Sequence, residues 1–270
     1  MLTTVFFGSR NRFDQLLVHW LSTRTELAGV VWTTSAAWRH TWRGRLRFTR
    51  SRLRRCGPAR TLDEIAFFLV FQRFLRDRDA AALERDVIDP YVAERGPMKW
   101  RGDQIRAAEV NDPRVLTFVR ERSPDLILAM CTNDWFGKEL RAAPRDGVFV
   151  WHEGITPEYR GLYPPFWAVR RLDFVRIGYT LLRMSDRLDA GDVYVQGRLD
   201  GVDPRRHGHL YLGHRAIWES LPAVERFLGA LESGAAEPID RSGAPDRLFT
   251  YPGLTDLVAQ RWALRRAGRA

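Results

Sequence analysis

The chain has 270 residues, of which 45% are hydrophobic and 28% are charged, and its formal net charge is +10. This length and composition are typical of a globular protein with one large domain, or one domain and a small appendage. Two cysteines, Cys56 and Cys131, exclude a disulfide framework and lack the spacing of a metal site. A reducing, cytoplasmic setting is therefore expected.

The N-terminal residues MLTTVFFGSRNRFDQ lack the basic segment and long apolar run of a signal peptide. The longest apolar run, residues 65–71, is far shorter than the roughly 20 residues that a membrane span needs. We therefore expect no secretion signal and no membrane span.

The positive charge is concentrated in one segment. Residues 38–60 contain nine arginines and no Asp or Glu, so the remaining chain carries about 10 − 9 = +1. Such a segment is either a solvated insertion or a site that recruits an anionic partner, for example a nucleotide, a folate tail, a membrane surface or RNA. Both interpretations stay open.

The first elements predict an α/β domain. Strands are expected over 4–7 and 27–33, with a helix over 13–21 between them, which is the usual opening of a doubly wound sheet. Thr61 and Glu64 then have the spacing of a capping box at the start of a helix. That helix is apolar first and charged later, which favours docking on the sheet over lying on a membrane surface.

The rest of the chain predicts a mainly parallel sheet and a helical C-terminal part. Further strands are expected over 104–110, 126–130, 148–151, 174–183 and 193–199, and helices over 112–122, 164–171, 210–231 and 254–266. We predict one domain over residues 1–197, with an arginine-rich insertion at about 38–60, and a mostly helical extension over residues 198–270.

Two clusters carry the side chains most suited to chemistry. His152 follows a buried strand and opens the loop WHEGITPEYRG, and Asp189 lies in the turn LDAGD. Ligands of α/β sheets bind at the carboxyl ends of strands. A His and a carboxylate placed there can form an acid–base pair in which a protonated imidazole stabilises an oxyanion. Equally, the residues alone are compatible with a structural histidine and a simple turn.

Residues 123–196 resemble the folate-dependent formyltransferases. The stretches SPDLILAM, VWHEGITPEYRG and RLDAGDVYVQ match the family pattern in order and separation. The resemblance implies a Rossmann-like formyltransferase fold over residues 1–197. It also implies N-formyl transfer from 10-formyltetrahydrofolate to an amine or hydroxylamine of a small molecule, so a nucleic-acid partner is not expected.

The resemblance also implies roles for individual residues. His152 would stabilise the oxyanion, and Asp189 would tune this histidine and assist proton removal. The pterin ring would be held by two loops, which comprise Ser185, Asp186, Arg187 and Leu188 in one and Asn133, Asp134 and Trp135 in the other. Candidates for contact with the acceptor are Gly154, Thr156 and Arg160, although Arg160 is also a member of the YRG turn and could be structural.

Val150 departs from the family pattern, which has Asn two residues before the His. Alternation along a strand puts residues 150 and 152 on one face, so Val150 occupies the expected place without a hydrogen-bond donor. Loss of one oxyanion donor typically costs about 10²–10³ in rate. Either Thr156 or Thr180 substitutes, or a strongly nucleophilic acceptor tolerates a slow site, or the site is redirected. A redirected site could catalyse hydrolysis, cyclisation or another acyl or one-carbon transfer, or it could only bind a ligand.

The run HGHLYLGH contains His207, His209 and His214 and invites a metal hypothesis. It has no cysteine pair and no helical HxxxH spacing, so no metal is expected. Acceptor identity and oligomeric state leave no signal in the sequence.

Overall fold

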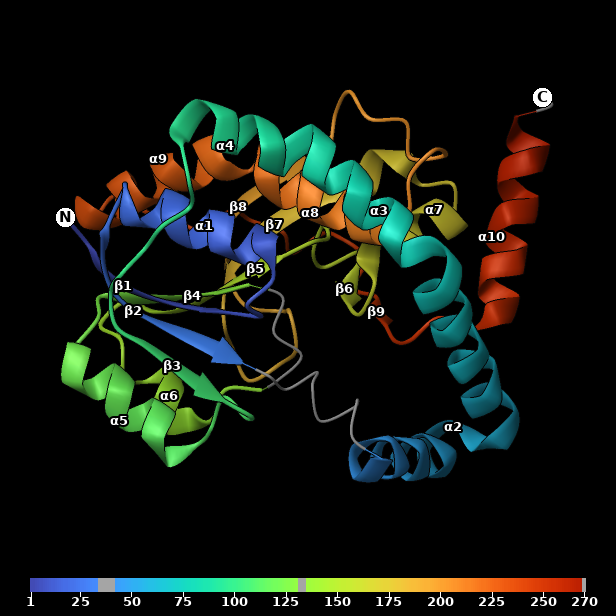
Figure 1. The fold of residues 1–270 in the computed structure, drawn as a ribbon, viewed down its shortest axis with the longest axis horizontal. Coiled ribbons are helices and arrows are strands. Elements are labelled where there is room, and N and C mark those ends of the chain that lie inside the picture. The colour runs from blue at the N-terminus through green and yellow to red at the C-terminus, as the bar shows by residue number, and fades with distance from the viewer. Residues whose placement is uncertain (34–41, 131–134, 269–270) are drawn as a thin grey trace.

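A seven-stranded sheet lies between two layers of helices in the computed structural model, which describes residues 1–33, 42–130 and 135–268 (Figure 1). The strand order is β3-β2-β1-β4-β5-β7-β8. The first five strands in the chain run parallel, whereas β7 is antiparallel to both of its neighbours. The predicted α/β class with a mainly parallel sheet is therefore confirmed.

The strands of the main sheet are β1 (Thr3–Gly8), β2 (Glu26–Thr33), β3 (Gln104–Ala107), β4 (Leu126–Met130), β5 (Gly147–His152), β7 (Gly178–Arg183) and β8 (Val193–Arg198). A second, two-stranded sheet pairs β6 (Arg160–Gly161) with β9 (Leu248–Phe249). The predicted strand over 174–183 begins only at Gly178, because residues 174–176 form a 3-10 turn, η4 (Phe174–Arg176).

Alternation along the strands divides the core between the two faces of the sheet. In β1, Phe6 packs in one hydrophobic cluster while Val5 and Phe7 pack in another. The Phe6 side is covered by α1 (Arg12–Ser22), α3 (Arg76–Leu83), α4 (Asp89–Arg95), α8 (His209–Glu219) and α9 (Leu221–Glu232). The other side is covered by α5 (Pro113–Arg122) and α6 (Lys138–Arg141).

A long helical stretch precedes α4. It begins with α2 (Trp42–Val70) and continues through two π-helical turns, η2 (Phe71–Leu75) and η3 (Glu84–Ile88), which flank α3. Gly57 kinks α2 with a φ of +78°. The predicted capping box is wrong: the Thr61 hydroxyl donates to the Gly57 carbonyl, and Glu64 accepts from Arg52. Thr61 lies inside a helix that resumes directly after the kink, so no free amides remain for it to cap.

The expectation that this helix docks on the sheet holds for its later part. Leu83 and Val87 are buried in the main core. In contrast, Leu69 and Phe74 are 60% and 67% exposed. The apolar first half therefore leaves part of its hydrophobic surface uncovered.

The C-terminal part of the chain is largely helical. The single helix expected over 210–231 is two, α8 and α9, which meet at Ser220 and contribute to the same core as the sheet. α7 (Pro164–Arg170) and α10 (Leu254–Ala267) follow their predicted ranges closely, and α10 packs against α2 and α7 (Figure 1). The boundary at residue 197 stays a prediction. Among the described helices, none has the length and apolar character needed to cross a bilayer.

A buried ion pair braces the kink of α2. Arg52 Nε and Nη2 donate to the Glu64 carboxylate at 2.8 and 2.5 Å, and both residues are buried. Glu64→Gln would leave the Arg52 guanidinium buried without its counter-charge, so we expect a loss of about 3–5 kcal/mol in the free energy of unfolding. Urea denaturation measures this loss.

The matched control is Arg85→Gln, which removes an exposed ion pair with Asp86 and should change stability by less than about 0.5 kcal/mol. Equal effects of Glu64→Gln and Arg85→Gln would show that the buried pair does not brace the kink.

Candidate active site

β5 positions the central histidine of the site. All six residues of β5 are buried, because the strand lies inside the sheet between β4 and β7. His152 is its last residue and lies opposite Thr180 of β7. Side chains alternate along β5, so those of His152 and Val150 point to the same face of the sheet as Val148. This face is the one that α5 and α6 cover.

The His152 ring is held from one side. Its Nε2 donates to the carbonyl oxygen of Tyr159 at 2.9 Å, and its Nδ1 lies 3.8 Å from Asp189 Oδ2. The bond to a carbonyl requires a proton on Nε2. Nδ1 is therefore the atom that can gain or lose a proton, and an added proton would face the Asp189 carboxylate.

The LDAGD turn places Asp189. Its Oδ2 accepts a hydrogen bond of 3.0 Å from the Gly161 amide, and its backbone has a left-handed φ of +46°. Gly191 in the same turn packs so closely on the Arg183 carbonyl that a Cβ would collide with it. The structure thus brings together the two residues that the sequence proposes as an acid–base pair.

The loop from Ser185 to Leu188 lies next to this pair. The Ser185 hydroxyl accepts from the Arg187 amide and donates to the Arg187 carbonyl, both at 3.2 Å. Leu188 is a large apolar side chain that is exposed beside Asp189 in sequence. The loop therefore offers ordered backbone and an apolar surface at the edge of the site.

Arg141 links the two loops that the resemblance assigns to the pterin. It donates to Asp186 at 2.6 Å and lies 5.5 Å from the centre of the Trp135 ring, which is 39% exposed. Sequence reasoning missed Arg141, because nothing in its neighbourhood matches a motif. Asn133 and Asp134 lie outside the described residues.

Gly154 and Thr156 lie in the loop after His152. A Cβ at Gly154 would collide with Pro164, so the loop packs tightly there. The Thr180 hydroxyl donates to the Gly154 carbonyl at 2.7 Å and accepts from the Thr156 amide and from Gln196 Nε2. The Thr156 hydroxyl is buried and has no partner among the described residues. Of the two threonines, only Thr156 retains an uncommitted donor.

Arg160 is buried and pairs with Asp246. Its Nη1 lies 2.6 and 2.7 Å from the two carboxylate oxygens, and Arg187 also donates to Asp246 at 2.8 Å. Nearby, Arg241 donates to the buried Glu158 at 2.6 Å. The shared partner Asp246 thus joins the YRG turn to the Ser185–Leu188 loop. Asp246 and Arg241 escaped sequence reasoning because they lie far along the chain in a segment without a motif.

Val150 belongs to a small apolar cluster. It packs with Leu182 and Val193, and Met184 lies against the same group. The wall beside His152 is therefore hydrophobic where the family pattern places an amide.

The three histidines of HGHLYLGH have different neighbours in the structure. His207 stacks on Tyr211, His209 packs on Phe71 with a ring separation of 4.4 Å, and His214 Nδ1 donates to the Leu210 carbonyl. Burial lowers the pKa of His209 to about 3 and that of His214 to about 4. Among the described residues, no group of three His, Cys, Asp or Glu side chains could hold a metal ion.

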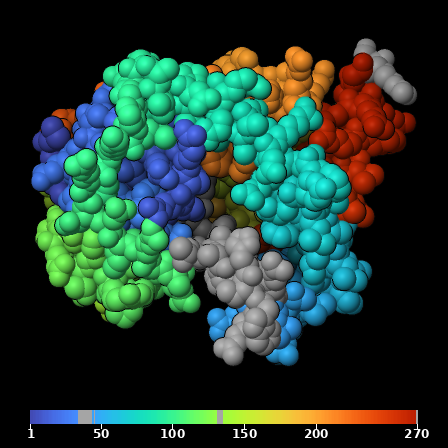
Figure 2. Space-filling model, viewed as in Figure 1, coloured from blue at the N-terminus to red at the C-terminus, as the bar shows by residue number. Residues whose placement is uncertain are grey.

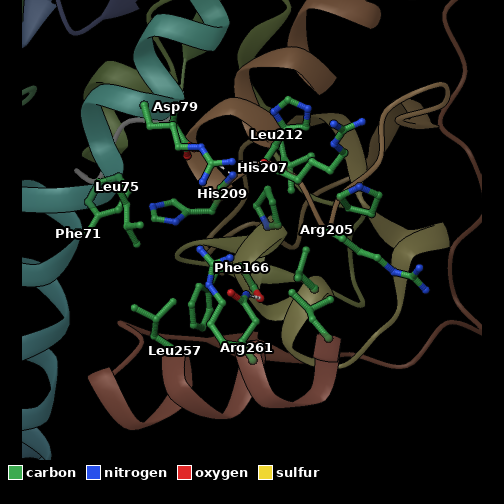
Figure 3. A pocket seen from close by; sticks show the side chains of 18 of the residues that line it. Phe71, Leu75, Asp79, Phe166, Arg205, His207, His209, Leu212, Leu257 and Arg261 are labelled. Carbon is green, nitrogen blue, oxygen red and sulfur yellow. Dashed lines mark hydrogen bonds between the residues drawn. The ribbon is translucent and has the colours of Figure 1, made fainter. Parts of the chain in front are cut away.

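A cavity of about 30 Å³ lies apart from the His152–Asp189 pair, between α3, α7, α8 and α10 (Figure 3). Phe71 and Phe166 form part of its apolar wall, and His209 and Arg261 extend toward it from different helices. None of the residues predicted for the site lines it, and this volume holds about one or two water molecules.

Comparison with known proteins finds a family that matches the part of the chain that holds these residues. Residues 76–207 match the family described as formyl transferase, and this range contains both His152 and Asp189. The chain is 31% identical over 133 residues to the methionyl-tRNA formyltransferase of Thermotoga maritima, and the match covers 49% of this chain and 42% of that protein. The chain thus spans about two fifths of the length of this curated relative.

Solved structures share the fold. A sugar N-formyltransferase from Shewanella sp. superposes with a TM-score of 0.52 and 11% identity over 96% of this chain and 87% of that one. Glycinamide ribonucleotide transformylase 1 from Symbiobacterium toebii superposes with a TM-score of 0.53 and 12% identity over 87% and 89%. Residues 76–207 therefore resemble the formyl transferase family, and the chain shares its overall fold with solved formyltransferases.

Glu153 is an acidic residue next to His152 that sequence reasoning left aside. Its carboxylate packs against Gly213 of α8 and has no hydrogen-bond partner among the described residues. Burial raises the pKa of Glu153 to about 8 from its ordinary value of 4.5. The folded protein therefore keeps a proton on Glu153 over a pH range in which the unfolded chain has lost it.

We expect this proton to make stability fall as pH rises from about 5 to about 8, because the folded state binds more protons than the unfolded state in that window. Glu153→Gln should be as stable as the wild type at pH 5 and more stable at pH 8. Thermal unfolding across this range measures the difference. Parallel curves for the two proteins would contradict the raised pKa.

Proposed function

We propose that the protein transfers a formyl group from 10-formyltetrahydrofolate to a primary amine or hydroxylamine of a small molecule. The observation that carries the proposal is the buried His152–Asp189 pair at the end of β5, with Nδ1 and Oδ2 3.8 Å apart. This pair lies in the segment that matches the formyl transferase family. In the reaction, the acceptor nitrogen would form a bond to the formyl carbon while the bond from that carbon to the folate nitrogen breaks. The acceptor nitrogen would lose one proton and the leaving folate nitrogen would gain one, which gives the formamide and tetrahydrofolate.

His152 acts on the charge that develops at the formyl oxygen. Its ring is fixed through Nε2 and Tyr159, so Nδ1 can present a proton without a change of rotamer. A fixed donor in a site shielded from water stabilises developing negative charge more strongly than a mobile one in solution. His152 is also buried, which provides that shielding.

Asp189 compensates the charge on the ring and helps to remove the amine proton. Its Oδ2 already accepts from the Gly161 amide, which fixes the direction of the carboxylate. The 3.8 Å to His152 is longer than a hydrogen bond, so the carboxylate can also serve the acceptor. Proton transfer by a positioned group contributes typically about 10²–10⁴ in rate.

The residues near this pair fit a flat heterocycle such as the pterin ring. Such a ring needs an apolar wall and hydrogen-bonding groups at its edge. Leu188 and the cluster around Val150 offer apolar surface, and the braced loop 185–188 offers backbone groups. The binding residues would thus be those of the Ser185–Leu188 loop, with Trp135 on the opposite side.

Thr156 is the substitute we favour for the missing amide donor. Its hydroxyl is buried without a partner in the described structure, whereas the Thr180 hydroxyl is fully engaged. An unpaired buried hydroxyl normally costs free energy. A bound substrate oxygen would give it a partner.

A redirected site is the second candidate function. The observation that favours it is the apolar packing of Val150 against Leu182 and Val193, which no family amide would share. In that case the same pair would catalyse hydrolysis or another acyl or one-carbon transfer.

Thr156→Val separates the two candidates. If Thr156 supplies the donor, the variant should lose about 10²–10³ in kcat while keeping or gaining stability, because an unpaired hydroxyl becomes a methyl group. Thr180→Val is the matched control, since it removes a hydroxyl with three hydrogen bonds and should lower the free energy of unfolding by about 1–3 kcal/mol.

Val150→Asn completes this comparison. Full activity of Thr156→Val, together with a sharp gain of formyl transfer in Val150→Asn, would favour the redirected site. Little change in Val150→Asn would support a donor that is already present.

His152→Ala and Asp189→Asn test the pair directly. We expect kcat to fall by about 10²–10⁴ in both variants, with calorimetric affinity for 10-formyltetrahydrofolate retained. The assay is the release of tetrahydrofolate on addition of a panel of primary amines and hydroxylamines. Asn at position 189 can still accept from the Gly161 amide, so Asp189→Asn should keep its fold.

Asp200→Asn, at an exposed position two residues after β8, is the control and should retain full activity. Full activity of His152→Ala would exclude the proposed role of His152. Absence of binding at millimolar 10-formyltetrahydrofolate in the wild type would exclude folate as the donor.

A further inference from the structure

The surface shared by α2, η2 and α10 carries large apolar side chains that nothing in the described structure covers. Leu69 and Phe74 are 60% and 67% exposed, and Val258 and Trp262 of α10 are 62% and 58% exposed. A groove of about 320 Å³ runs between the helices and is lined by Val70, Leu75, Leu257, Val258, Arg261, Trp262 and Arg265. We call this surface the α2–α10 face; Figure 2 shows the two helices side by side at one edge of the molecule.

Polar contacts fix the two helices to each other and use up the local carboxylates. Asp63 of α2 accepts from the amide and the hydroxyl of Thr255, and Arg60 lies 2.8 Å from Asp256. The sequence has no acidic residue from 65 to 76 and none after Asp256. The two helices are therefore held in a fixed relation, and the exposed Asp77, three residues after Phe74, is the one carboxylate set against the arginines described next.

Arginines surround the apolar side chains. Arg73 lies over the Phe74 ring at 5.2 Å, and Arg266 lies over the Trp262 ring at 4.0 Å. Arg261 and Arg265 line the groove itself. Within the described part of the chain, none of these four guanidinium groups has a carboxylate partner. Positive charge and exposed aromatic surface thus occupy the same face.

The cavity next to the groove is also lined by positively charged side chains. Arg261 lines both the groove and the cavity of Figure 3, where it faces the same space as His209. Three more arginines, Arg78, Arg205 and Arg206, also line the cavity. Asp79 also lines the cavity, and its carboxylate accepts hydrogen bonds from the backbone amides of Gly208 and Tyr211.

We propose that the α2–α10 face docks on the surface of an anionic phospholipid bilayer. Basic helices with exposed Trp, Phe and Leu bind at the boundary between headgroups and acyl chains, where apolar side chains enter the bilayer and arginines meet phosphates. The face has both components on two helices held in fixed relation. This inference does not depend on the proposed transfer reaction.

Electrostatic repulsion argues against a second copy of the chain as the partner that covers the α2–α10 face. An interface between two copies of this face would bring eight unpaired arginines together, and like charges in close contact cost several kcal/mol. RNA would pair with the arginines but would leave four large aliphatic and aromatic side chains without an apolar partner. A bilayer satisfies both groups and requires no matching shape.

Vesicle flotation tests the proposal with the full chain. We expect it to float with phosphatidylcholine vesicles that contain phosphatidylglycerol and not with pure phosphatidylcholine vesicles, and we expect the bound fraction to fall as salt rises. The double variant Arg261→Gln/Arg265→Gln should weaken binding by roughly thirty-fold. Phe74→Ser/Trp262→Ser should weaken it by at least about ten-fold, because two apolar side chains no longer enter the bilayer.

Matched controls use exposed residues elsewhere. Val175→Ser removes a side chain of similar exposure that lies on η4, and Arg226→Gln removes an exposed charge on α9; both should bind like the wild type. Thermal unfolding and far-UV circular dichroism of every variant exclude misfolding as the reason for lost binding, since all the substituted side chains are exposed.

Four results would overturn the proposal. The first is failure of the wild type to float with anionic vesicles. The second is equal binding of the face variants and the controls. The third is a stable dimer that Phe74→Ser/Trp262→Ser dissociates, without vesicle binding, because the face would then be a contact between copies. Binding to a labelled RNA duplex in the absence of vesicle binding would likewise replace the bilayer with nucleic acid.

Discussion

Three consecutive residues, Tyr159, Arg160 and Gly161, hold the candidate site together. The Tyr159 carbonyl accepts from His152, and the Gly161 amide donates to Asp189, so the spacing of the pair is set by one short stretch of backbone. Arg160 lies between them and is anchored by Asp246. The side chains that do chemistry come from β5 and from a turn after β7, but neither element alone fixes their separation. A shift of this stretch would move both partners at once.

Much of the fold could be predicted because its signals are local. Strands buried on both faces appear as continuous apolar runs, as for residues 126–130, and the helix over 112–122 has a clear start at Asp112, whose side chain accepts from Arg114. The length of α2 could not be predicted. Gly57 and Pro58 indicate a break in the sequence, whereas the structure bends the helix and continues it, with the Arg52–Glu64 pair spanning the bend. Such pairs are formed by tertiary burial and have no local signature.

In the candidate site, too, local motifs predict some residues, whereas others depend on tertiary contacts that the sequence does not indicate. The His152–Asp189 pairing followed from motifs with fixed order and spacing, and the structure places the two residues in contact range. The residues that support this pair lie elsewhere in the sequence. Arg141 contacts Asp186 in the Ser185–Leu188 loop, and Asp246 and Arg241 contact the YRG turn from the C-terminal part of the chain. Their partners depend on how distant loops meet, which a motif does not encode. The apolar neighbours of Val150 likewise became visible only when β7 and β8 were placed beside β5.

The two-residue pairing of β6 with β9 has a consequence for the order in which the protein forms. The Phe249 carbonyl accepts from the Leu162 amide, and the Phe249 ring stacks on the Tyr159 ring at 5.2 Å. Asp246 and Phe249 are therefore part of the scaffold of a histidine that precedes them by almost a hundred positions. A ribosome that has synthesised the chain as far as residue 207 has produced β5, β7, β8 and the whole matched segment, but not the contacts from Asp246 and Phe249. The contacts that fix the spacing of His152 and Asp189 are therefore complete only after the strand β9 has emerged.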